Sequence, residues 1–160
     1  MGSFRLTLSL HKEPDNKPVF CKVDGQRFAQ PRTVKFLADS KYRVDVNIRP
    51  AKTVRGIAVM EKSLEVTDNS SKLEDENASS YSAQFQLDNL QPSKKGQRES
   101  VSLHVKLDGG YEFTTTLQIK IYKANSTQHC DWGTTVHSIE YECHTDQQNN
   151  SIKIVKDTFR

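Results

Sequence analysis

Two neighbouring pairs of residues, His129-Cys130 and Cys143-His144, hold the side chains best suited to metal chemistry. A zinc site needs about four ligands that converge tetrahedrally. Adjacent side chains of a strand point to opposite faces, so Cys143 and His144 do not easily reach one ion together. The usual spacings of paired metal ligands are also missing. The sequence therefore predicts no metal and no other cofactor.

A Cys-His nucleophile is the second chemistry that these residue types allow. His137 shares a strand face with Ile139 and Tyr141 and could approach a thiol. A nucleophilic cysteine needs a lowered thiol pKa and a base held in place by a third residue. No nucleophile-elbow serine and no glycine-rich phosphate loop is present. We expect a hydrogen-bonded histidine and a protein that is not an enzyme, with Cys143 as a small buried apolar residue.

The three cysteines, Cys21, Cys130 and Cys143, are too few and of the wrong parity for a disulfide framework. The first residues lack the apolar core of a signal peptide, and no apolar run approaches the 20 residues of a membrane helix. We therefore expect a reduced, cytoplasmic chain. Whether Cys130 and Cys143 pair stays open.

Trp132, the single tryptophan, precedes Gly133, a residue that permits a tight turn. We expect the indole to plug one end of the β-structure. The alternative is an aromatic anchor at a partner surface.

The charge is uneven along the chain, although its net value is only +3. Residues 1–60 hold 12 Lys and Arg against 5 Asp and Glu, whereas residues 61–92 hold 2 against 7. A basic first third attracts an acidic peptide or an anionic membrane surface, unless it is only the solvated face of strands. The basic residues are scattered, without stacking aromatics, so nucleic acid is not an expected partner.

Alternation with a period of two is the dominant pattern, and it predicts strands with one buried face. The clearest runs are Phe4–Leu10, Tyr42–Ile48, Val101–Leu107, 111–123 and Ile139–Cys143. Asp24-Gly25 predicts a tight hairpin between Val19–Val23 and Gln26–Gln30, and Asp108-Gly109-Gly110 predicts another. Pro31 and Pro50 mark strand ends.

Several short strands with regular turns predict one all-β domain over residues 1–160, an antiparallel β-sandwich or filled β-barrel. The only helical segment that we expect is a short turn near 126–132. The polar stretches 67–80 and 91–100 are expected to be mobile loops.

Three strings occur in order along the chain: Val19–Phe28 (VFCKVDGQRF), His129–Gly133 (HCDWG) and Ile139–Cys143 (IEYEC). Together with Lys41–Pro50 (KYRVDVNIRP) they resemble the cannabinoid receptor-interacting protein 1 family. The motif residues that carry the resemblance are Asp24, Gly25, Trp132, Gly133, Tyr141 and Cys143. Residues 52–90 match poorly.

The resemblance implies a fold similar to the Rho GDP-dissociation inhibitor and a cytoplasmic adaptor, with recruitment to the inner face of the plasma membrane as a further expectation. Its implied partner is the C-terminal tail of a cannabinoid-type G-protein-coupled receptor, whose signalling it modulates. G-protein or a lipidated peptide is a further partner to consider. The alternative function is a carrier that shields a lipid-modified protein tail inside the β-structure.

Our own hypothesis for tail binding is that basic outward residues attract acidic groups of the tail. These residues are Lys22, Arg27, Lys35, Arg43 and Arg49. The tail itself would add to a sheet edge through main-chain hydrogen bonds.

Overall fold

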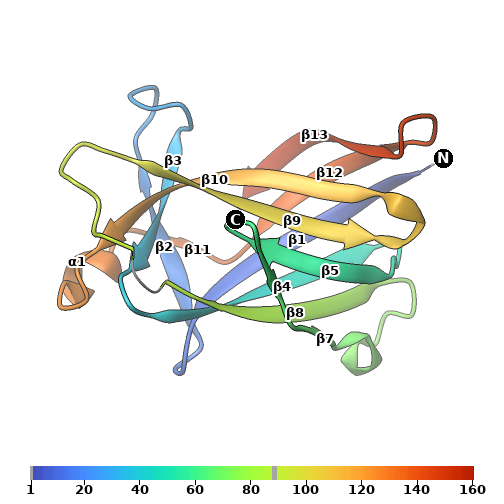
Figure 1. The fold of residues 1–160 in the computed structure, drawn as a ribbon, viewed down its shortest axis with the longest axis horizontal. Helices are drawn as coiled ribbons and strands as arrows, with labels where there is room; N and C mark the ends of the chain where they lie inside the picture. The colour runs from blue at the N-terminus through green and yellow to red at the C-terminus, as the bar shows by residue number, and fades with distance from the viewer. Residues whose placement is uncertain (1, 88–89) are drawn as a thin grey trace.

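A computed structural model of the chain describes residues 2–87 and 90–160, and it is mostly β-structure (Figure 1). Its strands follow the chain in this order: β1 (Ser3–Lys12), β2 (Lys17–Val23), β3 (Arg32–Leu37), β4 (Lys41–Arg49), β5 (Val54–Val59), β6 (Lys62–Leu64), β7 (Val66–Asp68), β8 (Ser79–Gln86), β9 (Glu99–Leu107), β10 (Glu112–Tyr122), β11 (Thr134–Val136), β12 (Ile139–Asp146) and β13 (Ser151–Phe159). The short helix α1 (Thr127–Cys130) lies where a helical turn was expected.

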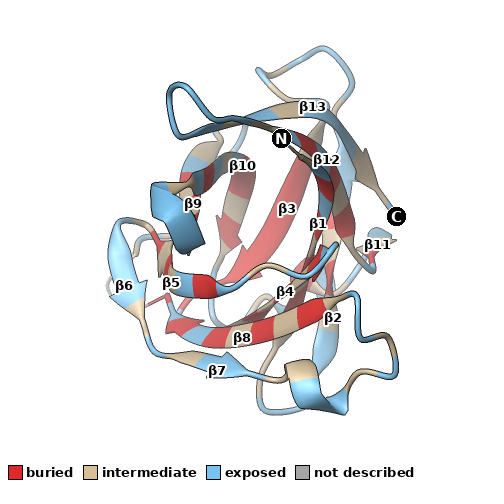
Figure 2. Cartoon of the chain, turned by 90° about the vertical axis from the view of Figure 1, so that its right-hand side faces the viewer, coloured by how far each residue is buried: buried red, intermediate tan, exposed pale blue. Residues whose placement is uncertain are grey.

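The strands form one large mixed sheet that includes a partial ring and is not a clean barrel (Figure 2). The ring runs through β1, β2, β3, β10, β13 and β12 and back to β1. From β1 the sheet continues through β4 and β8 to β7, and from β10 through β9 and β5 to β6. The core lies between these parts because the alternating apolar residues of each strand point inward (Figure 2).

The sheet is mixed and not antiparallel throughout, so the prediction of an antiparallel structure holds only in part. β10 runs parallel to β3, with Ile119 opposite Val34, and parallel to β13 at the single pair Glu112 and Ser151. A parallel neighbour needs a long connection, and the sequence between these strands is long enough to supply one. Local turn signals do not reveal such distant pairings.

The five alternating runs were confirmed as strands, each with slightly different ends: they are β1, β4, β9, β10 and β12. β9 and β10 pair across Asp108–Gly110 as expected. The prediction of a tight hairpin at Asp24-Gly25 was wrong. β2 pairs with β3, and residues 24–31 form a wide loop between these strands. In that loop the N–H groups of Asp24 and Gly25 donate to the carbonyl of Pro31.

The two stretches expected to be mobile lie mostly between strands. Residues 67–80 begin in β7, contain a 3₁₀ turn at Ser70–Lys72 and end in β8. Residues 91–100 lead into β9, which begins at Glu99. Their mobility stays a prediction.

Buried aromatic residues fill the interior from several strands. Phe36, Tyr42 and Phe85 pack together, with ring centroids of Phe36 and Tyr42 4.8 Å apart. Phe113 of β10 contacts Tyr141 of β12 edge-to-face at 5.1 Å. Such pairs add specific geometry to the burial of large apolar surfaces. Tyr141 and Cys143 are therefore core residues of the chain.

Candidate functional site

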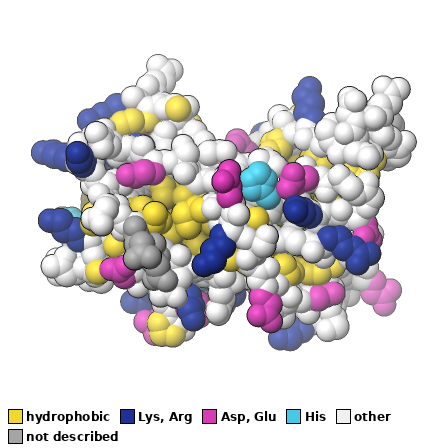
Figure 3. All heavy atoms as spheres, in the orientation of Figure 1, with side chains coloured by type: hydrophobic (Ala, Val, Ile, Leu, Met, Phe, Trp, Pro, Cys, Tyr) yellow, Lys and Arg dark blue, Asp and Glu magenta, His cyan; other side chains and the backbone are white. Residues whose placement is uncertain are grey.

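Three of the five basic residues expected to bind a partner lie at one end of the molecule. Lys22 is exposed on β2, Arg27 is exposed in the 24–31 loop, and Lys35 belongs to β3. Lys22 is opposite Thr33, so its side chain lies on the same face of the sheet as those of Thr33 and Lys35. Figure 3 shows basic side chains gathered at the end where Figure 1 places α1 and the loop before β9.

The other two basic residues lie elsewhere and already have acidic partners. Arg43 on β4 donates to Asp45 at 2.9 Å and to Glu13 at 3.0 Å, and it also contacts Asn16. Arg49, at the end of β4, forms an ion pair with Asp75 at 2.8 Å. The five residues therefore do not make one surface, and Arg43 has little free charge to offer a ligand.

Lys35 is not an outward residue, because only 5% of it is exposed. Its ammonium donates to the carbonyl oxygens of His129, at 3.0 Å, and of Trp132. Burial is the main reason why the pKa of Lys35 lies below its ordinary value. Lys35 thus holds the corner formed by α1 and Trp132 against β3.

Cations and aromatic rings alternate on the outer face of β3 and β10. The Lys35 nitrogen lies 5.4 Å from the centre of the Trp132 ring and 5.6 Å from that of Tyr122. The Lys120 nitrogen lies 5.1 Å from the same Tyr122 ring. We call Trp132, Lys35, Tyr122 and Lys120 the basic–aromatic strip. Cations at such distances are attracted to the negative face of the ring.

The strip lies in a positive environment. Burial lowers the pKa of Lys120, and the nearby charges of Arg98, Lys22 and Lys95 lower it further. The one acidic group that counteracts them, Asp24, is already bound to Arg98. A cation surrounded by cations gains energy when an anion approaches, so this face favours acidic groups.

The prediction that Trp132 plugs the β-structure was wrong, because 73% of the residue is exposed. Its position follows from Gly133, whose φ of +123° is a conformation that residues with a Cβ rarely adopt. A Cβ at Gly133 would also lie 3.0 Å from the carbonyl oxygen of Cys21. Gly133 thus lets the chain pass close to β2 while the indole stays outside, as expected for an anchor.

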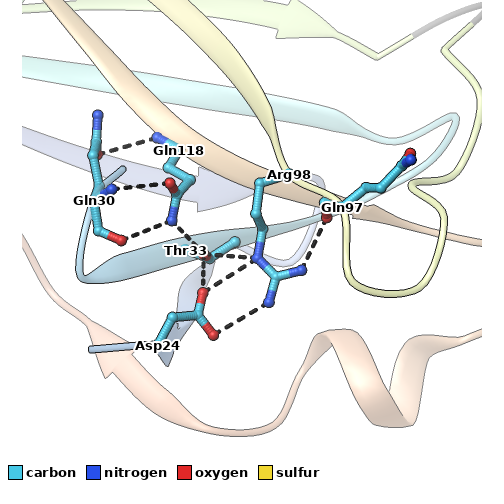
Figure 4. A network of polar contacts seen from close by, with 6 residues as sticks. All are labelled: Asp24, Gln30, Thr33, Gln97, Arg98 and Gln118. Atoms are coloured by element: carbon cyan, nitrogen blue, oxygen red, sulfur yellow. Dashed lines mark hydrogen bonds and ion pairs between the residues drawn. The ribbon is translucent and has the colours of Figure 1, made fainter. Parts of the chain in front are cut away.

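A buried polar network supports the loop next to the strip (Figure 4). Arg98 donates to both carboxylate oxygens of Asp24, each at 3.2 Å, and to the Thr33 hydroxyl at 3.0 Å. Gln118 of β10 donates to Thr33 and exchanges hydrogen bonds with Gln30. The Arg98 guanidinium also lies 4.2 Å from the centre of the Phe28 ring. These contacts join the 24–31 loop, β3, β10 and the segment that leads into β9.

Asp24 and Gly25 are therefore motif residues with structural roles. Asp24 holds the network, and Gly25 has a φ of +64° in the loop that Asp24 begins. The role of Arg98 was not predicted, because a basic residue in a polar loop usually faces solvent. A better signal for the strip was available: Gln118, Lys120 and Tyr122 follow one another on the polar face of a predicted strand.

The thiols lack the property that a nucleophilic cysteine needs. Burial raises the pKa of Cys130 to about 11 and that of Cys143 to about 12. His137 is exposed, whereas all three cysteines are buried and free. Among residues 2–87 and 90–160, no group of three His, Cys, Asp or Glu side chains is placed to hold a metal ion. In the same residues no helix is long and apolar enough to cross a membrane.

Comparison with known proteins gives one consistent result. A family model described as CB1 cannabinoid receptor-interacting protein 1 matches residues 1–159. Proteins of that name from Homo sapiens and Bos taurus are each 33% identical to the chain over 164 residues. The protein from Rattus norvegicus is 33% identical over 165 residues. Each alignment covers 99% of the chain and 96% of the relative.

Proposed function

Because the chain belongs to the CB1 cannabinoid receptor-interacting protein 1 family, we propose that it is a non-enzymatic adaptor for a cannabinoid-type G-protein-coupled receptor. In this proposal it binds the C-terminal cytoplasmic tail of the receptor and modulates its signalling. It acts in the cytoplasm, at the inner face of the plasma membrane. The observation that carries the proposal is the family match over nearly the whole chain.

The basic–aromatic strip and Lys22 are the surface that we propose for the tail. Trp132 is the exposed aromatic group, and residues of this kind supply much of the energy at protein interfaces. Lys22 and Lys120 attract acidic groups of the tail and speed its association. Lys35 contributes by holding the Trp132 corner in place, because its own ammonium is occupied by two carbonyl groups.

The experiment is an amide NMR titration with a synthetic peptide that covers the last 20 residues of the human CB1 receptor. We expect shifts on β2, β3, β10 and residues 129–133. Trp132→Ala should weaken binding at least about tenfold, as for an interface hot spot, and leave the fold intact. Trp132 faces solvent, so the change should alter the unfolding free energy by less than about 1 kcal/mol.

Tyr111→Ala is the aromatic control outside the strip, because Tyr111 follows the Asp108–Gly110 turn. Tyr111 packs partly against the core, so the unfolding free energy of this variant is measured as well. Unchanged affinity of the Trp132 variant would reject this surface. Absence of shifts at millimolar peptide would reject the receptor tail itself.

A second candidate function, the carrier of a lipid-modified tail, is favoured by one cleft. Beyond their single pair, β10 and β13 diverge, and a pocket of about 440 Å³ lies between them. Leu117, Tyr141 and Phe159 contribute to its walls. A lipid chain that enters here must displace core side chains, because Phe113 and Tyr141 occupy the space behind.

The same titration with an acylated or prenylated form of the peptide separates the two functions. A carrier predicts shifts of Leu117, Phe113 and Tyr141 with the lipidated peptide alone. An adaptor predicts the same surface shifts with both peptides. If only the lipidated peptide binds, the adaptor proposal is wrong.

A further inference from the structure

A pocket of about 570 Å³ lies at the N-terminal end of β1. This end of the strand is far from α1 (Figure 1). Lys12, at the C-terminal end of β1, contacts Asp131 beside α1, whereas Ser3, Phe4 and Arg5 at the N-terminal end line this pocket. Arg49 and Pro50, at the end of β4, and Val155 of β13 also line the pocket. The pocket is separate from the basic–aromatic strip.

Two arginines stand directly opposite one another in this pocket. Arg5 of β1 pairs with Arg49 of β4, and like charges in such cross-strand positions destabilise a sheet. The same row continues across the sheet in the order Arg49, Arg5, Glu142 and Lys156. Three cations in this row therefore face one carboxylate.

Both guanidinium groups have donors to spare. Arg5 approaches Glu142 only to 4.0 Å, and Arg49 contacts Asp75 at 2.8 Å. Each side chain is more than half exposed, and a guanidinium has five N–H donors arranged to match a carboxylate. An anion placed between Arg5 and Arg49 would offset their repulsion and use these donors.

An exposed apolar residue lies beside the arginines. Val155 is 53% exposed, and it is one of three large hydrophobic side chains that are exposed among the described residues. It is the extra residue of a β-bulge, because Glu142 pairs with Lys156 and Cys143 with Ile154. Bulges redirect side chains, and Val155 at this bulge lines the same pocket as Arg5 and Arg49.

We propose that this pocket binds the last residue of a peptide through its free α-carboxylate and an apolar side chain. Arg5 and Arg49 bind the carboxylate, and the exposed residues Val155 and Pro50 contact the side chain. A C-terminal residue is the part of a peptide that places a carboxylate and an apolar side chain on the same carbon atom. The inference rests on the proposed function, since a C-terminal tail ends in a free α-carboxylate.

The test compares two forms of each probe by NMR. The probes are the CB1 tail peptide as free acid and as C-terminal amide, and N-acetyl-leucine and its amide. We expect the free acids to shift the Nε–H signals of Arg5 and Arg49 and the Val155 methyl signals. The amidated tail should bind about fivefold or more weakly, because a charge-assisted bidentate contact is lost.

The double variant Arg5→Gln, Arg49→Gln should remove the difference between acid and amide. Arg55→Gln is the matched control, because Arg55 is equally exposed and pairs with one carboxylate, Asp108, outside the pocket. Equal affinity of the two tail forms would overturn the inference and leave tail binding intact. If the tail does not bind but N-acetyl-leucine causes shifts, the pocket is supported and the receptor tail is rejected as the partner. If neither probe causes shifts, both proposals are wrong.

Discussion

At Asp24, a carboxylate with 3% of its side chain exposed faces the guanidinium of Arg98, which is 5% exposed. Two buried charges remain ionised only if each is paired and hydrogen-bonded, and here Thr33 adds a further donor to Asp24. The pair therefore tolerates burial because the two charges contact each other and the carboxylate has a further hydrogen-bond donor. It also makes the 24–31 loop depend on a residue just before β9.

Asp24→Asn should destabilise the protein by about 3–5 kcal/mol, because it leaves the buried Arg98 without a countercharge. Urea denaturation measures this change. Asp108→Asn is the control: Asp108 pairs with Arg55 at the surface, where an ion pair contributes about 0–1 kcal/mol. Equal effects of the two variants would show that the Asp24 pair is not buried in solution.

The same carboxylate makes the unfolding free energy depend on pH in the acid range. Burial alone would raise the pKa of Asp24, but the hydrogen bonds from Arg98 and Thr33 and the charge of Arg98 outweigh it and hold the pKa below its ordinary value. A pKa lowered by folding stabilises above the unfolded value and ceases to do so as pH falls through the folded value. The difference in unfolding free energy between wild type and Asp24→Asn should therefore be constant above about pH 5 and shrink below about pH 4. Urea denaturation of both proteins at acid and at neutral pH measures this difference. If the difference stays constant over the whole range, the assignment is wrong.

Among the elements, α1 has little stability of its own. It has four residues, no side-chain cap and a single buried residue, Cys130. A helix this short does not persist through its own hydrogen bonds, so its place depends on contacts with the sheet. Lys35 from β3 and Lys12 from β1, through Asp131, supply these contacts.

Lys35→Met should loosen this corner, because it keeps the aliphatic stem but leaves the carbonyls of His129 and Trp132 without their donor. We expect a loss of about 1–3 kcal/mol in unfolding free energy and faster amide exchange at residues 129–136. Lys120→Met, on the same face, is the control, since Lys120 donates no hydrogen bond to α1 in the described structure. Unchanged exchange in the Lys35 variant would mean that Lys12 and Asp131 hold the helix by themselves.

The dependence of α1 on Lys35 also links this helix to the proposed binding of the tail. If Lys35→Met releases Trp132, tail affinity should fall even though the ammonium of Lys35 does not reach the ligand. The strip is thus an arrangement of three elements, β3, β10 and the α1 corner.

Across the whole molecule, charge separates into regions that the net value of +3 conceals. At one end Arg98, Lys22 and Lys95 lower the pKa of Lys120, while the two arginines of the proposed carboxylate pocket lie at the other end. The acidic stretch before β8 contributes Asp75, which partners Arg49. In the proposed function, a tail peptide would therefore meet two positive regions on the folded protein.

Binding of an acidic tail should weaken as salt rises, because screening shortens the reach of exposed charges to about 10 Å at 0.1 M and about 3 Å at 1 M. The double variant Lys22→Gln, Lys120→Gln should bind more weakly and show a flatter salt dependence. Arg43→Gln should leave the salt dependence unchanged, because Arg43 is already neutralised by Glu13 and Asp45. Calorimetry from low to high salt measures both, and an equal effect of Arg43 would place the tail elsewhere.

Local pattern alone determined much of this protein. Alternation placed five strands and their inward residues, Asp108–Gly110 placed a turn, and Ser126 to Trp132 placed a helical turn. These succeed because the side-chain period of a strand is a property of neighbours in the chain. The short strings around Trp132 and Tyr141 also identified the family before any fold was known.

Only the tertiary structure decided which distant residues meet. It paired β10 with β3 and β13 in parallel, buried Lys35 and Arg98, exposed Trp132 and divided five predicted basic residues among separate surfaces. Alternation says which face a side chain takes, but not what covers that face. Lys35 is buried because α1 folds over it, and Trp132 is exposed because Gly133 turns the chain away. Both outcomes depend on contacts across about a hundred residues, which no local period encodes.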